Sequence, residues 1–319
     1  MKQYDDPELQ EIAEKLTDPD PGIRRVAVLA LVDSGEPEAA ELLIQALKDE
    51  DPAVRQEAAK VVDEFDAEDI ADSLLAALSD GDEVVRNAAA HALADLKDPS
   101  VAPPLLAALE RSTDPFVVAG ILRALKPLRV AAAQTPALHR LSDDDARVRR
   151  EAVGVLGWLK AVENLPALID RARSDADPEV RRAAAGALVY ASAERVGPPL
   201  VAILADPHWQ VRCEAALGIG KLDYQAGLEA LITASRDGTW QVREKAAEAL
   251  GKLGGVAAVP ALGECARDAM SNLRKAAIGA LGTIAEPECR PYIERALDDP
   301  DPDVRKLARW AQSQLDNAA

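Results

Sequence analysis

A short string, Asp-x-Asp-Pro-x-Val-Arg with small variations, recurs along the whole chain and limits what the chain can fold into. Successive copies lie 31 or 32 residues apart, with one double step. A fixed period of this size is typical of chains built from stacked, similar units rather than from one compact core. The arginines of the nine copies are Arg24, Arg55, Arg86, Arg149, Arg181, Arg212, Arg243, Arg274 and Arg305.

An aspartate lies six residues before each of these arginines. In the double step, Val118 stands where the arginine is expected and Ser112 where the aspartate is expected. Because both charged residues are missing from the same copy, we infer that they act as a pair. The aspartates are Asp18, Asp49, Asp80, Asp143, Asp175, Asp206, Asp237, Asp268 and Asp299.

Each copy predicts a helical hairpin. The segment that starts at the arginine has apolar residues at positions i, i+3, i+4 and i+7, the pattern of an amphipathic helix. An Asp-Pro dipeptide ahead of it, as at Asp51 and Pro52, supplies an N-cap acceptor and a proline for the first helical position. A second apolar segment follows after a short turn, for example at 39–49. Helices this short need their neighbours for stability, so the hairpins must stack.

The composition fits thin stacked layers. The chain has only 4 Trp, 4 Tyr and 2 Phe, whereas large compact cores depend on aromatic side chains for buried area. An alanine stands three residues after the arginine in most copies, which allows the helices to approach closely. These alanines are Ala27, Ala58, Ala89, Ala152, Ala184, Ala215, Ala246 and Ala277.

The period, the DPxVR helix start, the Ala-rich first helix and the Leu-rich second helix resemble the HEAT-like repeats of bacterial scaffold proteins and of phycobilin lyases. The resemblance covers about residues 18–315. It implies an all-α fold, a single α-solenoid (1–319) of about ten hairpins that form a right-handed superhelix. It also implies an Asp–Arg ladder between successive units, with Asp49, Arg55, Asp80, Arg86, Asp175, Arg181, Asp206, Arg212, Asp237, Arg243, Asp268 and Arg274 among its members.

Both ends of the repeat array read as single capping helices. Residues 7–16 resemble an isolated second helix, and residues 304–315 an isolated first helix that carries Lys306, Arg309 and Gln312. We expect both helices to close the stack with polar surface.

The charge is unevenly distributed. The net charge is −18, and residues 1–110 contain all of the excess, so residues 143–319 belong to a neutral C-terminal body. An acidic chain is a poor ligand for nucleic acid and for anionic membranes, because phosphates need clustered Lys and Arg. The acidic N-terminal arm, 1–110, has two interpretations: it docks a protein partner through that partner's basic patch, or it only keeps the chain soluble.

The copy without the charged pair, 111–142, is irregular in a second respect. It contains Gly120, Pro127 and Pro136, residue types that weaken or end helices. It is either a hinge between the acidic arm and the neutral body or a tolerated irregularity.

Aromatic and basic residues recur at two fixed places. Trp209 and Trp240 each lie three residues before an arginine, and they are either a partner-binding hot spot or a cover for the core. A second set lies nine residues after the arginine and should line one edge of the stack at a spacing of about 10 Å. That edge is either a partner-binding surface or simply solvated, and it contains Asp33, Glu64, Asp95, Pro127, Trp158, Tyr190, Lys221, Lys252 and Thr283.

Nothing in the sequence indicates catalysis or a cofactor. His91, His139 and His208 are isolated, and no His-Glu dipeptide, the iron-binding pair of the HEAT-repeat enzyme deoxyhypusine hydroxylase, is present. Phosphate-binding, nucleophile-elbow and zinc-protease motifs are also absent from the sequence. The three cysteines show no CxxC spacing and fall at different positions of the repeat, so we expect buried thiols rather than a metal centre. Several glycines, among them Gly220, Gly251 and Gly254, are expected to end helices.

These observations favour a non-catalytic protein-binding scaffold or adaptor. The cysteine number and the lack of a leader or apolar span indicate a reducing cytoplasm. We also expect a monomer. The resemblance adds a possible setting, the assembly of a cofactor- or metal-containing protein. The alternative is a phycobilin lyase-like protein that binds a linear tetrapyrrole and its acceptor subunit. It needs a basic, aromatic-lined groove, for which Lys221 and Lys252 beside Tyr190 are the candidates.

Overall fold

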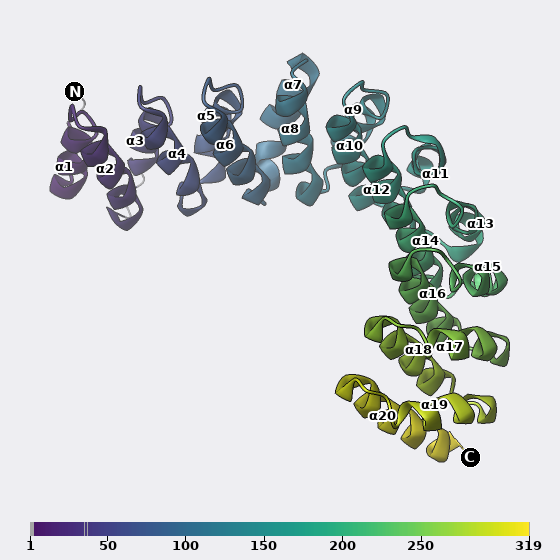
Figure 1. The fold of residues 1–319 in the computed structure, drawn as a ribbon. Helices are drawn as coiled ribbons and strands as arrows, with labels where there is room; N and C mark the ends of the chain where they lie inside the picture. The colour runs from purple at the N-terminus through teal and green to yellow at the C-terminus, as the bar shows by residue number, and fades with distance from the viewer. Residues whose placement is uncertain (1–2, 35, 37, 319) are drawn as a thin grey trace. The chain divides into compact units, whose positions relative to one another are not determined.

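The computed structural model describes residues 3–34, 36 and 38–318, and every regular element in this part of the chain is helical. The predicted all-α architecture of stacked hairpins is confirmed (Figure 1). The chain divides into two compact units, Met1–Leu159 and Lys160–Ala319. The predicted division into arm, irregular repeat and body places its boundaries elsewhere, at 110 and 142, and stays a prediction, as does the handedness of the superhelix.

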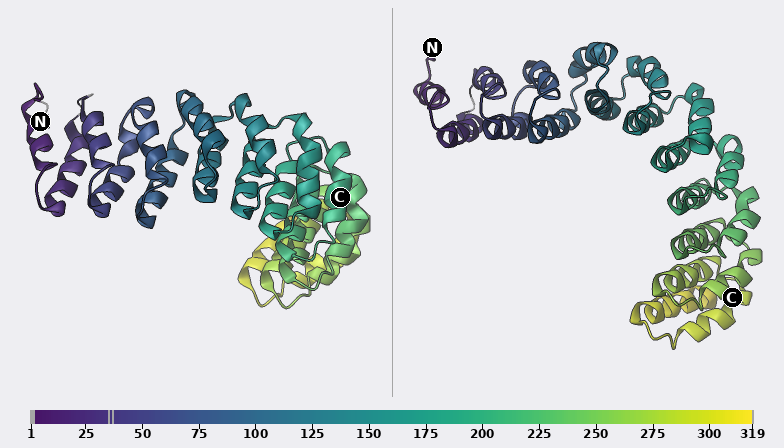
Figure 2. Two further views of the ribbon diagram at one scale, coloured as in Figure 1. Left: turned by 90° about the horizontal axis from the view of Figure 1, so that it is seen from above. Right: turned by 45° about the horizontal axis from the view of Figure 1, so that its top comes forward.

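The first unit has two layers of helices. First-type helices, which carry the repeat arginine, lie side by side in the order α2, α4, α6, α8, α10, and each second-type helix packs on the first-type helix that follows it (Figure 2). The helices are α1 (Pro7–Lys15), α2 (Pro21–Ser34), α3 (Ala39–Ala46), α4 (Pro52–Lys60), η1 (Val62–Glu64), α5 (Ala67–Ala77), α6 (Glu83–Asp95), η2 (Pro99–Val101), α7 (Ala102–Arg111), α8 (Pro115–Leu128), η3 (Ala131–Ala133), α9 (Gln134–Arg140) and α10 (Ala146–Leu159).

The second unit repeats this arrangement. Its first-type layer runs α12, α14, α16, α18, α20, and α11, α13, α15, α17 and α19 pack on it from one side. The helices are η4 (Val162–Asn164), α11 (Leu165–Ser174), α12 (Pro178–Leu188), α13 (Ala193–Ile203), α14 (Trp209–Lys221), η5 (Gln225–Gly227), α15 (Leu228–Ala234), α16 (Trp240–Leu253), η6 (Val256–Ala258), α17 (Val259–Cys265), α18 (Ser271–Ile284), η7 (Pro287–Cys289), α19 (Arg290–Ala296) and α20 (Pro302–Ala318).

The repeat string starts the first-type helices in the predicted way. Asp51 is the N-cap of α4, in extended conformation, and its Oδ1 accepts a hydrogen bond from Ala53 N at 2.8 Å. Pro52 occupies the first helical position, where no amide hydrogen is needed. The alanines three residues after the repeat arginines are fully buried (0% exposed) between the layers. The same string therefore sets both the start of the helix and the face that it buries.

In the second unit, glycines bring the first-type helices into close contact. A Cβ atom on Gly220 would lie 2.8 Å from Ala249 Cα, and one on Gly251 would lie 2.7 Å from Ala280 Cα. Neither position has room for a side chain. Of the glycines expected to end helices, Gly254 does so, as the C-cap of α16 with φ of 72°, whereas Gly220 and Gly251 lie inside the last turns and act in packing.

The two capping helices are present as α1 and α20. The expected polar surface at the ends of the stack stays a prediction, and α20 also carries Trp310, which is 41% exposed. This aromatic side chain contributes to the candidate site described below.

The irregular repeat forms an ordinary hairpin of α8 and α9. Gly120 is buried, and a Cβ there would lie 3.3 Å from Leu78 Cδ2. Pro127 lies in the last turn of α8 and Pro136 in the first turn of α9, where neither interrupts the hairpin. A hinge at 111–142 stays a prediction. Among the described residues, no helix combines the length and apolar character needed to cross a bilayer.

Candidate functional site

Arginine–aspartate contacts connect the loops that precede successive first-type helices. Arg212 donates from Nε and Nη2 to the two carboxylate oxygens of Asp237, at 2.8 and 2.9 Å. Its Nη1 donates to the backbone carbonyl of Asp206 at 2.8 Å. We call this arrangement a rung. The same double contact links Arg24 with Asp49, Arg55 with Asp80, Arg181 with Asp206, and Arg274 with Asp299.

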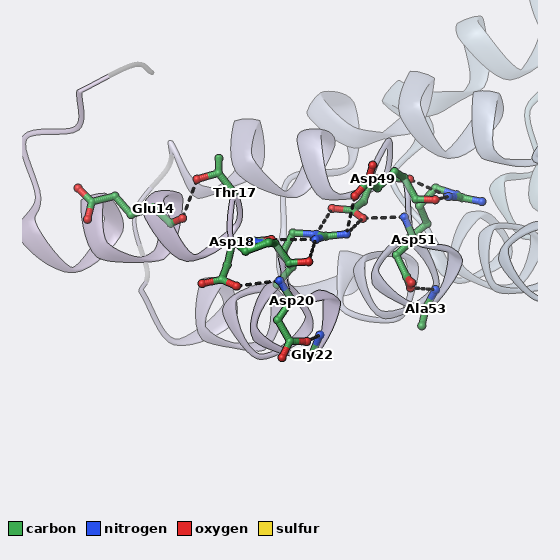
Figure 3. A network of polar contacts seen from close by, with 12 residues as sticks. Glu14, Thr17, Asp18, Asp20, Gly22, Asp49, Asp51 and Ala53 are labelled. Atoms are coloured by element: carbon green, nitrogen blue, oxygen red, sulfur yellow. Dashed lines mark hydrogen bonds and ion pairs between the residues drawn. The ribbon is translucent and has the colours of Figure 1, made fainter.

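Each rung thus uses two aspartates differently. The aspartate six residues before the arginine contributes its carbonyl oxygen, and the aspartate 25 residues after it contributes its carboxylate. Figure 3 shows the first rung, with Asp18 and Asp49 on the two sides of the guanidinium. Asp20 and Asp51, which cap the helices, lie beside it.

Two of the predicted ladder arginines depart from this geometry. Arg243 reaches Asp268 through Nη2 alone, at 2.8 Å, and its Nε is buried without a hydrogen-bond partner in the described structure. Arg86 binds the carbonyl oxygen of Asp80, and its guanidinium lies 5.8 Å from the centre of the Phe116 ring. Asp175 accepts from Arg181 Nη1 at its carbonyl oxygen, as in a regular rung, and Arg171 Nη1 adds a contact to its buried carboxylate at 3.3 Å.

The irregular repeat obtains its rung from a residue outside the period. Arg140, at the end of α9, donates from Nη2 to the carbonyl oxygens of Leu109 and Ser112, both at 2.9 Å. Its Nη1 contacts Asp143 Oδ2 at 3.3 Å. Ser112 and Asp143 are the positions that an arginine at Val118 would join, so Arg140 replaces the missing arginine. Arg140 cannot be recognised as a rung residue from the sequence, because no repeat spacing marks it.

The exposed face of the first-type helices carries a groove in the second unit. The groove has a volume of about 900 Å³ and lies across α16, α18 and α20. Glycine and alanine residues of α16 and α18 form its floor, and Trp310 of α20 lies at its edge. Its charged and larger lining residues are Glu248, Lys252, Lys275, Asp303, Lys306, Leu307 and Trp310.

The residues predicted for partner binding occupy separate places. In the second unit, Lys221 Nζ lies 5.3 Å from the centre of the Tyr190 ring, and Lys160 Nζ lies 4.6 Å from it. The structure therefore brings Tyr190 and Lys221 together, while Lys252 lies in the groove. In the first unit, Arg129 lies 4.7 Å above the ring of Trp158.

Trp209 and Trp240 lie at the opposite end of their helices. They are the first residues of α14 and α16, whereas Lys221 and Lys252 belong to the last turns of the same helices. A helix of 13 residues, such as α14, separates its ends by about 18 Å. Trp209 is exposed and Trp240 is half-buried. The two tryptophans are therefore separate from the surface that carries Lys221 and Lys252.

The pKa shifts of the titratable groups reflect structural contacts and burial rather than a catalytic site. Hydrogen bonding to Arg274 lowers the pKa of Asp299. Burial raises the pKa of both Cys213 and Cys265 to about 11, so these thiols are protonated at neutral pH. Within the part of the chain that the structure describes, no three His, Cys, Asp or Glu residues gather to hold a metal ion.

Comparison with known proteins decides the family. The family model of HEAT repeats matches residues 40–126, 104–189, 197–275 and 266–319. The chain belongs to the HEAT-repeat family. A model of the PBS lyase HEAT-like repeat also matches residues 23–49. No curated protein sequence shows significant similarity to this HEAT-repeat chain.

Three solved structures illustrate the fold. Kap95p, from a structure of its binding to RanGDP, has a TM-score of 0.68 at 14% identity, over 96% of this chain and 51% of Kap95p. Kap121p has a TM-score of 0.57 at 15% identity, over 98% of this chain and 41% of its own. An engineered protein has a TM-score of 0.50 at 20% identity, over 98% and 99% of the two chains. The chain spans about half of the length of Kap95p and less than half of that of Kap121p. The likeness to these structures shows the HEAT-repeat fold alone.

Proposed function

We propose that this HEAT-repeat protein is a non-catalytic scaffold that binds a protein partner on the exposed face of its first-type helices. The observation that carries the proposal is the groove across α16, α18 and α20, where Trp310 is 41% exposed at the edge of an apolar floor. An accessible tryptophan beside a pocket is typical of binding hot spots. The fold supports the proposal, because HEAT solenoids are typical protein-interaction scaffolds.

The charges of the groove indicate the chemistry of the partner. Lys275 has only a long contact, 4.0 Å, to Asp303. Lys252 and Lys306 have no carboxylate partner among the described residues. An apolar side chain would fill the floor, and acidic residues beside it would pair with the free ammonium groups. The groove therefore fits a partner segment that carries an apolar anchor flanked by Asp or Glu.

The other features of the proposal rest on the sequence. The acidic arm, 1–110, would select a partner with a basic patch, and the protein would act as a cytoplasmic monomer. An accessory role in the assembly of a cofactor- or metal-containing protein is the setting that we propose on the family resemblance.

Affinity capture with matched tryptophan variants tests the groove. We expect wild-type protein to capture a defined partner from the cytosol of its source, Trp310→Ala to recover about tenfold less, and Trp209→Ala to recover the same amount. Trp209 is a suitable control because it is exposed to a similar extent, 37%. Recovery that falls only with Trp209→Ala, or that is unchanged in both variants, would reject the groove as the docking surface.

Tetrapyrrole binding in the groove is a second candidate function. It combines Lys252 and Lys306 with an aromatic side chain, and its volume, about 900 Å³, lies in the range of small-molecule sites. A linear tetrapyrrole such as biliverdin, added to the protein, should leave its visible spectrum unshifted if the scaffold proposal holds. A shift that disappears in Trp310→Ala would favour the lyase-like function instead.

A further inference from the structure

A cluster of cations surrounds one buried carboxylate in the first unit. The side chain of Glu151, in α10, is 8% exposed. Its carboxylate oxygens lie 3.5 Å from Arg123 Nη2, 3.6 Å from Lys126 Nζ and 3.2 Å from Arg150 Nη2. Arg123 and Lys126 come from α8, and Arg150 precedes Glu151 in α10. We call these four residues the basic cluster.

The basic cluster contains more positive charge than it neutralises. Its three cations share a single carboxylate, and none of them contacts another acidic residue in the described structure. Their side chains remain 31–38% exposed, whereas the carboxylate lies beneath them. An arginine has five donor N–H groups, so donors of Arg123 and Arg150 remain available to a ligand. Glu151 therefore positions the three cations but leaves some of their N–H donors free to bind a further anion.

Neighbouring residues extend the basic cluster into a surface with an aromatic end. The stem of Lys126 crosses α10 at Gly154, where a Cβ would lie 3.1 Å from Lys126 Cδ. Trp158 lies one turn further along α10, is 39% exposed, and has Arg129 4.7 Å above its ring. The face of α8 and α10 thus presents cations and an accessible aromatic ring side by side.

We propose that the basic cluster binds an acidic peptide segment of a protein partner, with its carboxylates on Arg123, Lys126 and Arg150 and an apolar residue against Trp158. Guanidinium groups match carboxylates in shape as well as charge. A nucleic acid fits less well, because its phosphate backbone extends well beyond three cations, whereas the carboxylates of a short peptide segment can all lie on the basic cluster. This site is independent of the groove in the second unit.

Fluorescence anisotropy with a labelled peptide, Asp-Glu-Asp-Leu-Glu-Asp, tests the proposal on the full chain. We expect saturable binding that weakens with added salt and that falls about tenfold in Arg123→Gln and in Lys126→Gln. Each single variant leaves two cations on Glu151, and the melting temperature of each variant shows that it is folded. Lys97→Ala is the matched control, because Lys97 is an exposed cation of the same unit outside the basic cluster, and it should bind like wild type.

Other outcomes separate this site from its alternatives. The peptide also matches the segment proposed for the groove, so the cluster variants are compared in a Trp310→Ala background. Binding to the basic cluster should persist in that background, so failure of the groove does not decide the fate of the basic cluster. The proposal is overturned by absence of peptide binding at low salt or by equal binding in Arg123→Gln, Lys126→Gln and wild type. Tighter binding of a single-stranded oligonucleotide than of the peptide would also overturn it.

Discussion

At the scale of single residues, the arginine of a regular rung, such as Arg212, binds two different acceptors, a carboxylate and a backbone carbonyl. The sequence predicts that Arg and Asp act together, because both are missing from the same copy. It does not determine which aspartate supplies the carboxylate, because aspartates before and after the arginine recur at the same period. The structure places the carboxylate of Asp237, rather than that of Asp206, on Arg212. Only the carbonyl oxygen of Asp206 reaches that arginine.

Arg140 shows a second limit of sequence reasoning at this scale. The sequence marks the irregular repeat by what it lacks, and a substitute that lies outside the repeat register leaves no periodic signal. Geometry is needed to see that Arg140 joins Ser112 to Asp143.

We predict that Arg140→Ala lowers the free energy of unfolding by about 1–3 kcal/mol, because it leaves two carbonyl groups and a carboxylate without their donor. Arg111→Ala should change it by less than about 0.5 kcal/mol, because Arg111 is exposed and has no ion pair within the described residues. Urea unfolding of the two variants beside wild type measures the difference. Equal stabilities would mean that Arg140 does not act as a substitute rung.

At the scale of helices, the sequence predicts the elements well and their surfaces less well. The capping helices expected at 7–16 and 304–315 are Pro7–Lys15 and Pro302–Ala318. Lys252 was expected on an exposed edge and lines the groove. Trp310, the principal feature of the groove, was not identified. It lies five residues after Arg305, a position that holds Lys60 in α4 and Gly279 in α18, so no repeating residue type marks it.

We predict that Gly251→Ala destabilises the second unit by about 1–3 kcal/mol, because the new methyl group would meet the backbone of α18 at Ala280. Gly238→Ala is the control, since nothing lies within 4 Å of a Cβ at that position. Thermal melting followed by circular dichroism measures both. A Gly251→Ala protein as stable as the control would show that α16 and α18 can separate at little cost.

At the scale of the whole chain, the rungs make stability depend on carboxylates. The family and the stacked hairpins follow from the period, because a 31- or 32-residue repeat with helical patterning leaves few other folds open. The partner does not follow from it, because partner choice depends on exposed side chains that differ from one repeat to the next. The groove and the basic cluster are both formed by side chains of this kind, which do not recur in every repeat.

We predict an acid transition. The pKa of Asp299 is lowered from 3.8, chiefly by Arg274, so its ionised form contributes stability that is complete above this value and is lost as the pH falls through the lower pKa of the folded state. The pKa values of Asp206 and Asp237 are also lowered: burial raises them, but the contacts with arginine and backbone amides outweigh it.

The melting temperature should therefore change little between about pH 7 and 5 and fall below about pH 4. In Arg274→Gln, whose Asp299 has lost its main partner, this fall should be smaller. An identical acid profile for wild type and Arg274→Gln would contradict the assignment.

The central claim is that rungs between successive hairpins hold the stack together, and a double-mutant cycle on Arg212 and Asp237 tests it most directly. The account predicts that Arg212→Gln and Asp237→Asn each cost about 2–4 kcal/mol at pH 7, and that the double variant reveals a coupling of at least about 1 kcal/mol. Urea unfolding of the four proteins, with the denaturant slope checked in each, provides the values. A coupling within about 0.3 kcal/mol of zero would contradict the claim.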